Sequence, residues 1–165
     1  MIKTNRLILN HLKESDQNDL INLFKDPLIG KTYMVPELHS KEEEDAIFKR
    51  IRDITLSDKH YTFGIYLKDK LIGFINDVEI NSDLIEVGYF ISSKEWNKGY
   101  ASEALKAYID YLFSKGFKRV EAAHFENNLA SGRVMEKCGM HKIDKTVDVE
   151  YRGVTYKGIY YEIVK

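Results

Sequence analysis

A change of hydrophobic period between residues 83 and 112 constrains the fold more than any other feature of the sequence. Residues 83–92 (DLIEVGYFIS) are rich in β-branched and aromatic side chains, as in a strand. Further on, apolar side chains repeat with the i, i+3, i+4, i+7, i+8, i+11 spacing of one helix face, at Ala101, Ala104, Leu105, Tyr108, Ile109 and Leu112. The chain must therefore pass from strand to helix through the short segment WNKGYA, which contains Gly99.

A strand that enters a helix through such a turn directs several backbone N–H groups at one point. The helix dipole adds partial positive charge there, so a phosphate fits the arrangement. The candidate donors are the amides of Lys98, Gly99, Tyr100, Ala101 and Ser102, with the Lys98 ammonium as a further charge. The alternative is that Gly99 only permits the turn.

The remaining segments predict the order β α α β β β α β α β β. Strands are expected in residues 6–12, twice in 60–80, and in 83–92, 118–125 and 141–164, the last as a hairpin around Arg152 and Gly153. Helices are expected in residues 15–26, 40–56, 101–116 and 128–139. Residues 25–40 contain both prolines of the chain, which favours a loop.

Composition narrows the classes of protein and partner. With 165 residues, 44% of them hydrophobic, the chain is expected to form a single domain over residues 1–165. A net charge of −1 gives no field that would attract nucleic acid or an anionic membrane. This balanced charge favours a small or peptide-like partner. The single cysteine, the absence of a signal-peptide pattern and the lack of a long apolar run predict a cytoplasmic protein.

Other chemical motifs are absent. The GKT sequence at residues 30–32 ends like a P-loop, but Lys25 stands where the first glycine would be, and no G-x-G-x-x-G occurs. The five histidines have no ligand-like spacing with Cys138 or with an acidic cluster, so no metal is expected. Cys138 lies in the apolar stripe of its helix and is interpreted as a packing residue.

Two segments together resemble the GNAT N-acetyltransferase superfamily. They are IEVGYFISSKEWNKGYASEAL and FENNLASGRVMEKCGM, and the resemblance extends from TNRLILNHLKESD to the final hairpin. Within the superfamily, the chain resembles the branch that acetylates the N-termini of ribosomal proteins. The resemblance implies an α/β (α+β) GNAT fold, with a mixed, mostly antiparallel sheet of about seven strands and about four flanking helices.

The resemblance also implies an acetyl-CoA site. The family's Q/R-x-x-G-x-G/A segment, which binds pyrophosphate through its amides, corresponds to Trp96–Ala101, so its cofactor residues are Trp96, Asn97, Lys98, Gly99, Tyr100, Ala101 and the following Ser102. VGYFIS corresponds to the splayed, bulged strand that pairs with the pantetheine arm, which places Phe90 and Ile91 beside it. Asn128 matches a family asparagine near the pantetheine, although a plain helix N-cap is the alternative.

The catalytic pattern departs from most of the family. Ser131 occupies the helix position where most members have an alanine. Met135, four residues later, occupies the position where most members have a tyrosine that acts as the general acid. Ser131 shares an i, i+3, i+4, i+7 stripe with Val134, Met135 and Cys138, so its hydroxyl is expected to face inward, toward the cofactor. The resemblance to the ribosomal-protein branch implies that Ser131 is the proton donor to the sulfur, with a packing role as the alternative. Glu86, expected to share a strand face with Gly88 and Phe90, is the predicted base, with a solvated surface charge as the alternative. Weaker candidates are Glu126, Tyr151, Tyr156, Tyr160 and Tyr161.

The expected activity is acetyl transfer from acetyl-CoA to a primary amine by direct attack in a ternary complex. The resemblance favours a protein N-terminus as acceptor. The alternatives are a small amine, such as a polyamine, aminoglycoside or amino acid, and a non-catalytic acyl-CoA-binding module. The protein is expected to be a monomer or homodimer without nucleic-acid or membrane partners.

Overall fold

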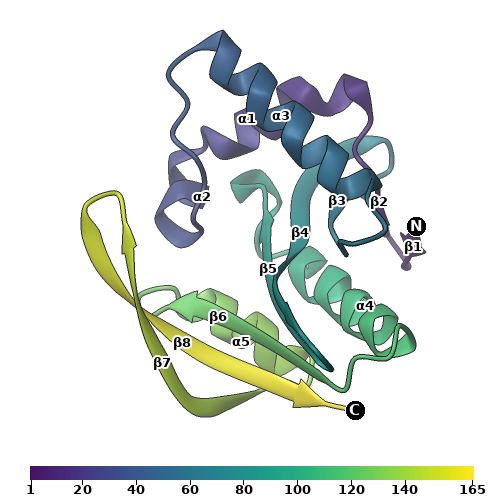
Figure 1. The fold of residues 1–165 in the computed structure, drawn as a ribbon, viewed down its shortest axis with the longest axis vertical. Coiled ribbons are helices and arrows are strands. Elements are labelled where there is room, and N and C mark those ends of the chain that lie inside the picture. The colour runs from purple at the N-terminus through teal and green to yellow at the C-terminus, as the bar shows by residue number, and fades with distance from the viewer.

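The computed structural model describes residues 1–165 as one eight-stranded sheet with helices on both faces (Figure 1). The strands are β1 (Ile2–Lys3), β2 (Leu7–Asn10), β3 (Phe63–Leu67), β4 (Lys70–Asn81), β5 (Leu84–Ile91), β6 (Arg119–Phe125), β7 (His141–Tyr151) and β8 (Val154–Val164). The helices are α1 (Gln17–Phe24), α2 (Pro27–Thr32), α3 (Lys41–Leu56), α4 (Tyr100–Ser114) and α5 (Leu129–Lys137). The predicted mixed, mostly antiparallel sheet flanked by helices is confirmed.

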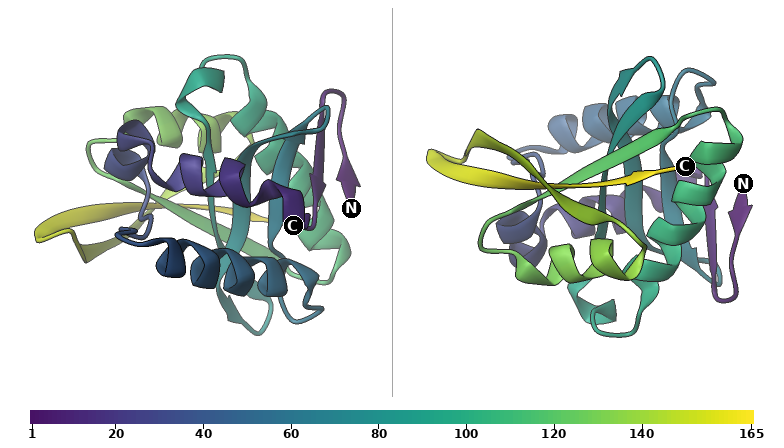
Figure 2. Two further views of the ribbon diagram at one scale, coloured as in Figure 1. Left: turned by 90° about the horizontal axis from the view of Figure 1, so that it is seen from above. Right: turned by 90° about the horizontal axis from the view of Figure 1, so that it is seen from below.

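The sheet order is β1-β2-β3-β4-β5-β6-β8-β7, and β5–β6 is its only parallel pair. Figure 2 shows α1 and α3 in front of the sheet in one view and α4 and α5 in front of it in the opposite view. Each face has its own hydrophobic core, the larger one under α4 and α5 and the other under α1, α2 and α3. None of the helices is both long and apolar enough to cross a membrane.

The expected helix after Gly99 forms as α4, whose predicted stripe is buried from Ala104 to Leu112 and packs on the sheet. Gly116, with φ +104°, follows the end of that helix as predicted. The hairpin also forms as predicted: Arg152 and Gly153 both have positive φ, as a two-residue type I′ turn requires.

Strands β5 and β6 separate halfway along their length. They pair from Leu84–Arg119 to Val87–Ala122, and no pairing continues beyond these residues. The second half of β5, from Gly88 to Ile91, remains paired with β4 on its other side. A wedge-shaped opening therefore lies in the middle of the sheet, and the segment that follows β5 leads directly into α4.

Three details differ from the sequence predictions. Residues 27–32, expected as loop, form α2, because Asp26 caps it through the Leu28 N–H at 2.9 Å and Pro27 fits a first helical turn. A short additional strand, β1, pairs with β2. The irregular pairing expected in the cofactor strand lies in its partner β4, between Asp77 and Glu79, rather than in β5.

Candidate functional site

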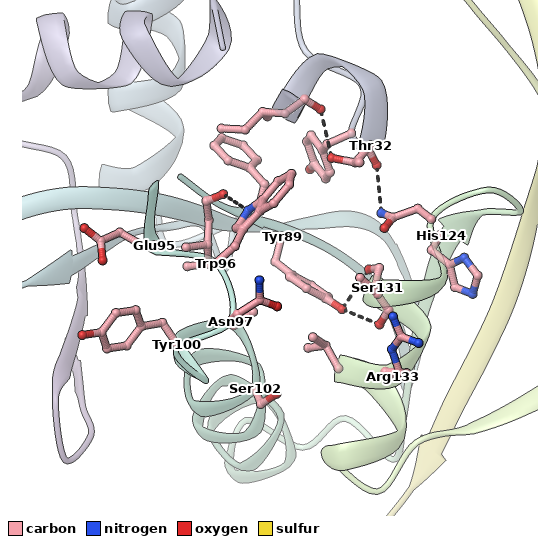
Figure 3. A pocket seen from close by; sticks show the side chains of 18 of the residues that line it. Thr32, Tyr89, Glu95, Trp96, Asn97, Tyr100, Ser102, His124, Ser131 and Arg133 are labelled. Carbon is pink, nitrogen blue, oxygen red and sulfur yellow. Dashed lines mark hydrogen bonds between the residues drawn. The ribbon is translucent and has the colours of Figure 1, made fainter. Parts of the chain in front are cut away.

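A cavity of about 420 Å³ occupies the opening between β5 and β6. Its walls come from the end of α2, the second half of β5, the segment before α4, the first turn of α4, the end of β6 and the exposed side of α5. Of the predicted cofactor residues, it is lined by Phe90, Ile91, Trp96, Asn97, Gly99, Tyr100, Ala101, Ser102, Asn128 and Ser131. Segments that are distant in the sequence therefore meet in one site, as Figure 3 shows for several of them.

The turn before α4 presents free backbone donors to this cavity. Gly99 has φ +81°, and the first intrahelical bond runs from the Glu103 N–H to the Gly99 carbonyl at 3.0 Å. The N–H groups of Tyr100, Ala101 and Ser102 precede that bond and have no acceptor within the protein. Because all three residues line the cavity, this end of it suits an anion of the size of a phosphate.

The Lys98 ammonium does not serve as the expected additional charge. It bonds the Glu95 carboxylate at 2.7 Å and the Lys94 carbonyl at 3.2 Å, and Lys98 does not belong to the cavity wall. The i, i+3 carboxylate of Glu95 therefore holds the ammonium away from the cavity. The contribution of Lys98 to the site is limited to its backbone.

Trp96 stabilises the end of the cofactor strand. Its indole N–H donates to the Ile91 carbonyl at 2.8 Å, and the ring lies beside the cavity (Figure 3). Phe90 points to the face of the sheet covered by α1, α2 and α3. There the centroid of its ring lies 5.0 Å from the centroid of the Tyr33 ring. Trp96, Phe90 and Ile91 thus form one end of the cavity wall.

Ser131 faces the cavity, and Tyr89 contacts it from the strand opposite. The Tyr89 hydroxyl lies 3.1 Å from Ser131 Oγ and 3.2 Å from the Ser131 carbonyl oxygen (Figure 3). Burial raises the pKa of Tyr89, so its hydroxyl remains protonated and available as a donor. Sequence reasoning missed Tyr89, although strand alternation places it on the face opposite Phe90, toward α5.

Two further positions, one on α5 and one just before it, test the sequence interpretation. Met135, at the usual tyrosine position, is fully buried in the core and presents no polar group to the cavity. Asn128 precedes α5 without a side-chain capping bond, so the plain N-cap alternative does not hold. Its amide instead donates to the Thr32 carbonyl at 3.4 Å and connects α5 with α2.

Glu86 lies on the other face of β5. Its carboxylate accepts a hydrogen bond from the Tyr160 hydroxyl at 3.3 Å, and it pairs in register with Glu79 on β4 and Glu121 on β6. Burial raises the pKa of Glu86, and the charge of Lys145 partly offsets this increase. Glu86 does not itself line the cavity, but Gly88, two positions along the same strand, does. A carboxyl group with a raised pKa at this position is a candidate general base.

Tyr33 lines the cavity, and the charge of Glu86 acts on its hydroxyl. Its hydroxyl donates to Asn76 Oδ1 at 2.7 Å, and burial raises its pKa. A Cβ on Gly88 would lie 2.6 Å from the Tyr33 hydroxyl, so the close approach of this ring requires glycine. Sequence reasoning missed Tyr33 because the strand position that accommodates it is 55 residues away.

Most of the weaker catalytic candidates make packing or structural contacts, and one contacts a predicted catalytic residue. The Tyr156 ring stacks on Phe125 at 4.5 Å, and the Tyr151 hydroxyl accepts the Val35 N–H at 3.4 Å. Tyr161 bonds Glu136 on α5. Of the tail tyrosines only Tyr160 contacts a predicted catalytic residue. Glu126 lines a second pocket, between α5 and strands β6, β7 and β8.

Comparison with known proteins gives consistent matches. The family model described as "Acetyltransferase (GNAT) domain" matches residues 6–141. "Uncharacterized N-acetyltransferase YoaA" of Bacillus subtilis is 28% identical over 171 residues, covering 100% of this chain and 97% of that protein.

Two solved structures share the fold at low sequence identity. A ribosomal L7/L12 α-N-protein acetyltransferase in complex with coenzyme A superposes with a TM-score of 0.85 at 16% identity, covering 98% of this chain and 95% of that one. The Vibrio cholerae spermidine N-acetyltransferase in complex with CoA and spermine gives a TM-score of 0.79 at 20% identity, covering 96% and 95%. These two proteins have different acceptors, so the shared fold does not identify the acceptor of this chain.

Proposed function

The chain belongs to the acetyltransferase (GNAT) family and is an acetyl-CoA-dependent N-acetyltransferase; on that premise we propose that it acetylates a primary amine by direct attack in a ternary complex. The observation that carries this proposal is the opening between β5 and β6. Its walls carry both the free amides at the start of α4 and the hydroxyl groups of Tyr89 and Ser131.

The residues that line the cavity fit acetyl-CoA. The free amides of Tyr100, Ala101 and Ser102 would hold the diphosphate, and the Gly99 amide would complete that loop. The edge of β5 at Phe90 and Ile91, left unpaired on the β6 side, would face the pantetheine arm. When bound, acetyl-CoA supplies an acetyl group activated as a thioester.

The two proton-handling groups lie on opposite faces of β5. Glu86 would accept a proton from the attacking amine, and Ser131 would donate its hydroxyl hydrogen bond to the departing sulfur. An N–C bond forms while the C–S bond breaks; Glu86 takes the proton from nitrogen and passes it to solvent, and the sulfur, stabilised as a thiolate by the Ser131 hydrogen bond, takes up a proton from solvent, so that the overall transfer balances. The Tyr89 hydroxyl lies 3.1 Å from Ser131 Oγ, close enough to donate to it when the Ser131 hydroxyl points into the cavity.

The acceptor would approach from the face that carries Glu86. Tyr33 and Tyr160 flank that face, and the tip of the β7–β8 hairpin reaches the segment after α2 through Arg152, whose guanidinium lies 3.5 Å from the Val35 carbonyl. A protein N-terminus is favoured by the resemblance to the ribosomal-protein branch. Small amines and a non-catalytic acyl-CoA-binding role are the competing proposals, and an acceptor screen separates them.

Ser131→Ala is expected to lower kcat about tenfold or more and to leave the Kd for CoA within about twofold, because it removes only a transition-state donor. Tyr89→Phe should lower kcat less, and the double variant should match Ser131→Ala, since Tyr89 acts through Ser131. The kcat and Kd values are measured by steady-state kinetics and calorimetry.

Tyr161→Phe is the matched control for Tyr89→Phe. It also removes a hydroxyl that contacts α5, but Tyr161 bonds Glu136 and does not line the cavity. Its kcat should equal that of the wild type. Additive losses in the Tyr89–Ser131 double variant would contradict the proposed pairing.

Cys138→Ala is expected to retain turnover within about twofold, with a stability loss of about 1 kcal/mol. Burial raises the pKa of the Cys138 thiol to about 11, its Sγ donates to the Ser102 carbonyl, and it does not line the cavity, so it is a poor nucleophile. Intact mass after incubation with acetyl-CoA should show no acetyl adduct. Loss of turnover in a folded variant that still binds CoA would exclude direct transfer.

A further inference from the structure

Residues near the N-terminus contact the loop that precedes α4. The Glu103 carboxylate, in the first turn of α4, accepts hydrogen bonds from the Thr4 hydroxyl at 2.6 Å, from the Arg6 backbone N–H at 2.7 Å and from Arg6 Nε at 2.7 Å. Residues 97 positions apart in the sequence are thereby joined at one helix terminus. These bonds fix Arg6 beside the loop.

Arg6 also holds one peptide group of the loop. Its Nη1 donates to the Lys98 carbonyl at 2.9 Å, its guanidinium lies 4.5 Å from the centroid of the Tyr100 ring, and its Nη2 would be 3.3 Å from a Cβ on Gly99. In a trans peptide the C=O and the following N–H point in opposite directions. Because Gly99 lines the cavity and Arg6 does not, this contact turns the Gly99 N–H away from Arg6, toward the cavity side.

Arg6 has an electrostatic effect at the same place. Burial opposes ionisation of Glu103, but the bonds from Thr4 and Arg6 outweigh it and hold its pKa below the usual value, so the group is a carboxylate. A negative charge in the first turn suits the helix dipole but repels a bound diphosphate. The Arg6 guanidinium pairs with that charge directly.

We propose that Arg6 is a positioning residue for diphosphate recognition, because it sets the direction of the Lys98–Gly99 peptide and neutralises Glu103. This inference rests on the proposed function, which assigns the loop to the diphosphate of acetyl-CoA. Arg6 acts without touching the ligand. Its effect is therefore expected on donors that carry the diphosphate and not on donors that lack it.

The test compares acetyl-CoA with S-acetylpantetheine, which has the same thioester and no phosphate. Arg6→Ala is expected to lower kcat/KM for acetyl-CoA about tenfold, the scale of one charge-assisted hydrogen bond, and to leave kcat/KM for S-acetylpantetheine within about twofold. Arg6→Lys, which keeps the charge but loses the planar fork, should fall between the two. Adding Glu103→Gln to Arg6→Ala should restore part of the loss, because it removes the unpaired carboxylate.

Arg119→Ala is the matched control. Its Nε pairs with Glu162 at 3.3 Å, its side chain is 49% exposed against 41% for Arg6, and it lies outside the cavity. It should change neither donor's kcat/KM. If Arg6→Ala does not fold, Arg6→Lys gives the same donor comparison.

Equal losses on both donors, or no loss on either, would overturn the positioning role while leaving the acetyltransferase proposal intact. Failure of the wild type to bind CoA in calorimetry would overturn the diphosphate assignment itself. The two failures are distinguishable because the calorimetry uses the unmodified protein.

Discussion

Gly99→Val is expected to weaken CoA binding by more than about a hundredfold, because the loop would lose two or more amide bonds to a charged diphosphate, each contributing about 1.5–3 kcal/mol. Gly99 has φ +81°, where a β-branched residue is strained, and the new Cβ would lie 3.3 Å from Arg6 Nη2. The loop must therefore rearrange, and the amides of Tyr100 and Ala101 lose their common direction. Calorimetry with CoA measures the loss.

Gly116→Val is the matched control for backbone strain. Gly116 also has positive φ, +104°, but it follows the opposite end of α4, and a Cβ added there would meet no atom within 4 Å. We expect a stability loss of about 1–2 kcal/mol in either variant, and loss of CoA affinity only in Gly99→Val. Gly99→Asn should lose less affinity than Gly99→Val, since asparagine tolerates this region. CoA binding that survives Gly99→Val unchanged would remove the loop from the cofactor site.

Glu86→Gln is expected to lower kcat by about two to three orders of magnitude, the usual contribution of a general base. Because burial raises the pKa of Glu86 above its ordinary 4.5, activity of the wild type should fall on the acid side at a pH higher than an exposed glutamate would give. The ionised form is the base, so activity is present above that pKa and is lost as the pH falls through it. The kcat/KM profile against pH measures this limb, which Glu86→Gln should abolish.

Two neighbouring charges should move the same limb in opposite directions. The charge of Glu79 raises the pKa of Glu86, so Glu79→Gln should shift the limb to lower pH. The charge of Lys145 lowers it, so Lys145→Gln should shift the limb to higher pH. Both variants keep the base and should keep the plateau within about twofold. A limb that responds to neither substitution belongs to the acceptor amine or to another group.

The elements with a sustained period were predictable from the sequence. The apolar stripe of α4, the buried strand β5 and the Arg152–Gly153 turn each follow from local spacing and local backbone preference. Helix α2 was not, because Pro27 and Gly30 are typical helix breakers. Pro27 is nevertheless compatible with the first turn, where its missing N–H has no partner to lose.

The site was predictable only where it follows the chain. The turn at Gly99 and the inward face of Ser131 come from local patterns, and both line the cavity. Three features depend on distant partners: Arg6 bonds the loop 92 residues away, Tyr89 bonds Ser131 42 residues away, and Tyr33 lies over Gly88. Hydrophobic period carries no information on such contacts. The ion pair between Lys98 and Glu95 was also missed, although its i, i+3 spacing is local. A carboxylate at that spacing competes with a ligand for the lysine ammonium.

The central claim, acetyl transfer to an amine, is tested most directly by incubating the purified protein with acetyl-CoA and a panel of peptides with free N-termini, polyamines, aminoglycosides and amino acids. Released CoA thiol and the mass of each amine are measured together. We predict that at least one amine gains an acetyl group in equal amount to the thiol released, with no acetylated enzyme. Binding of acetyl-CoA with no acetylated amine across the whole panel would contradict the account and favour a non-catalytic acyl-CoA-binding module.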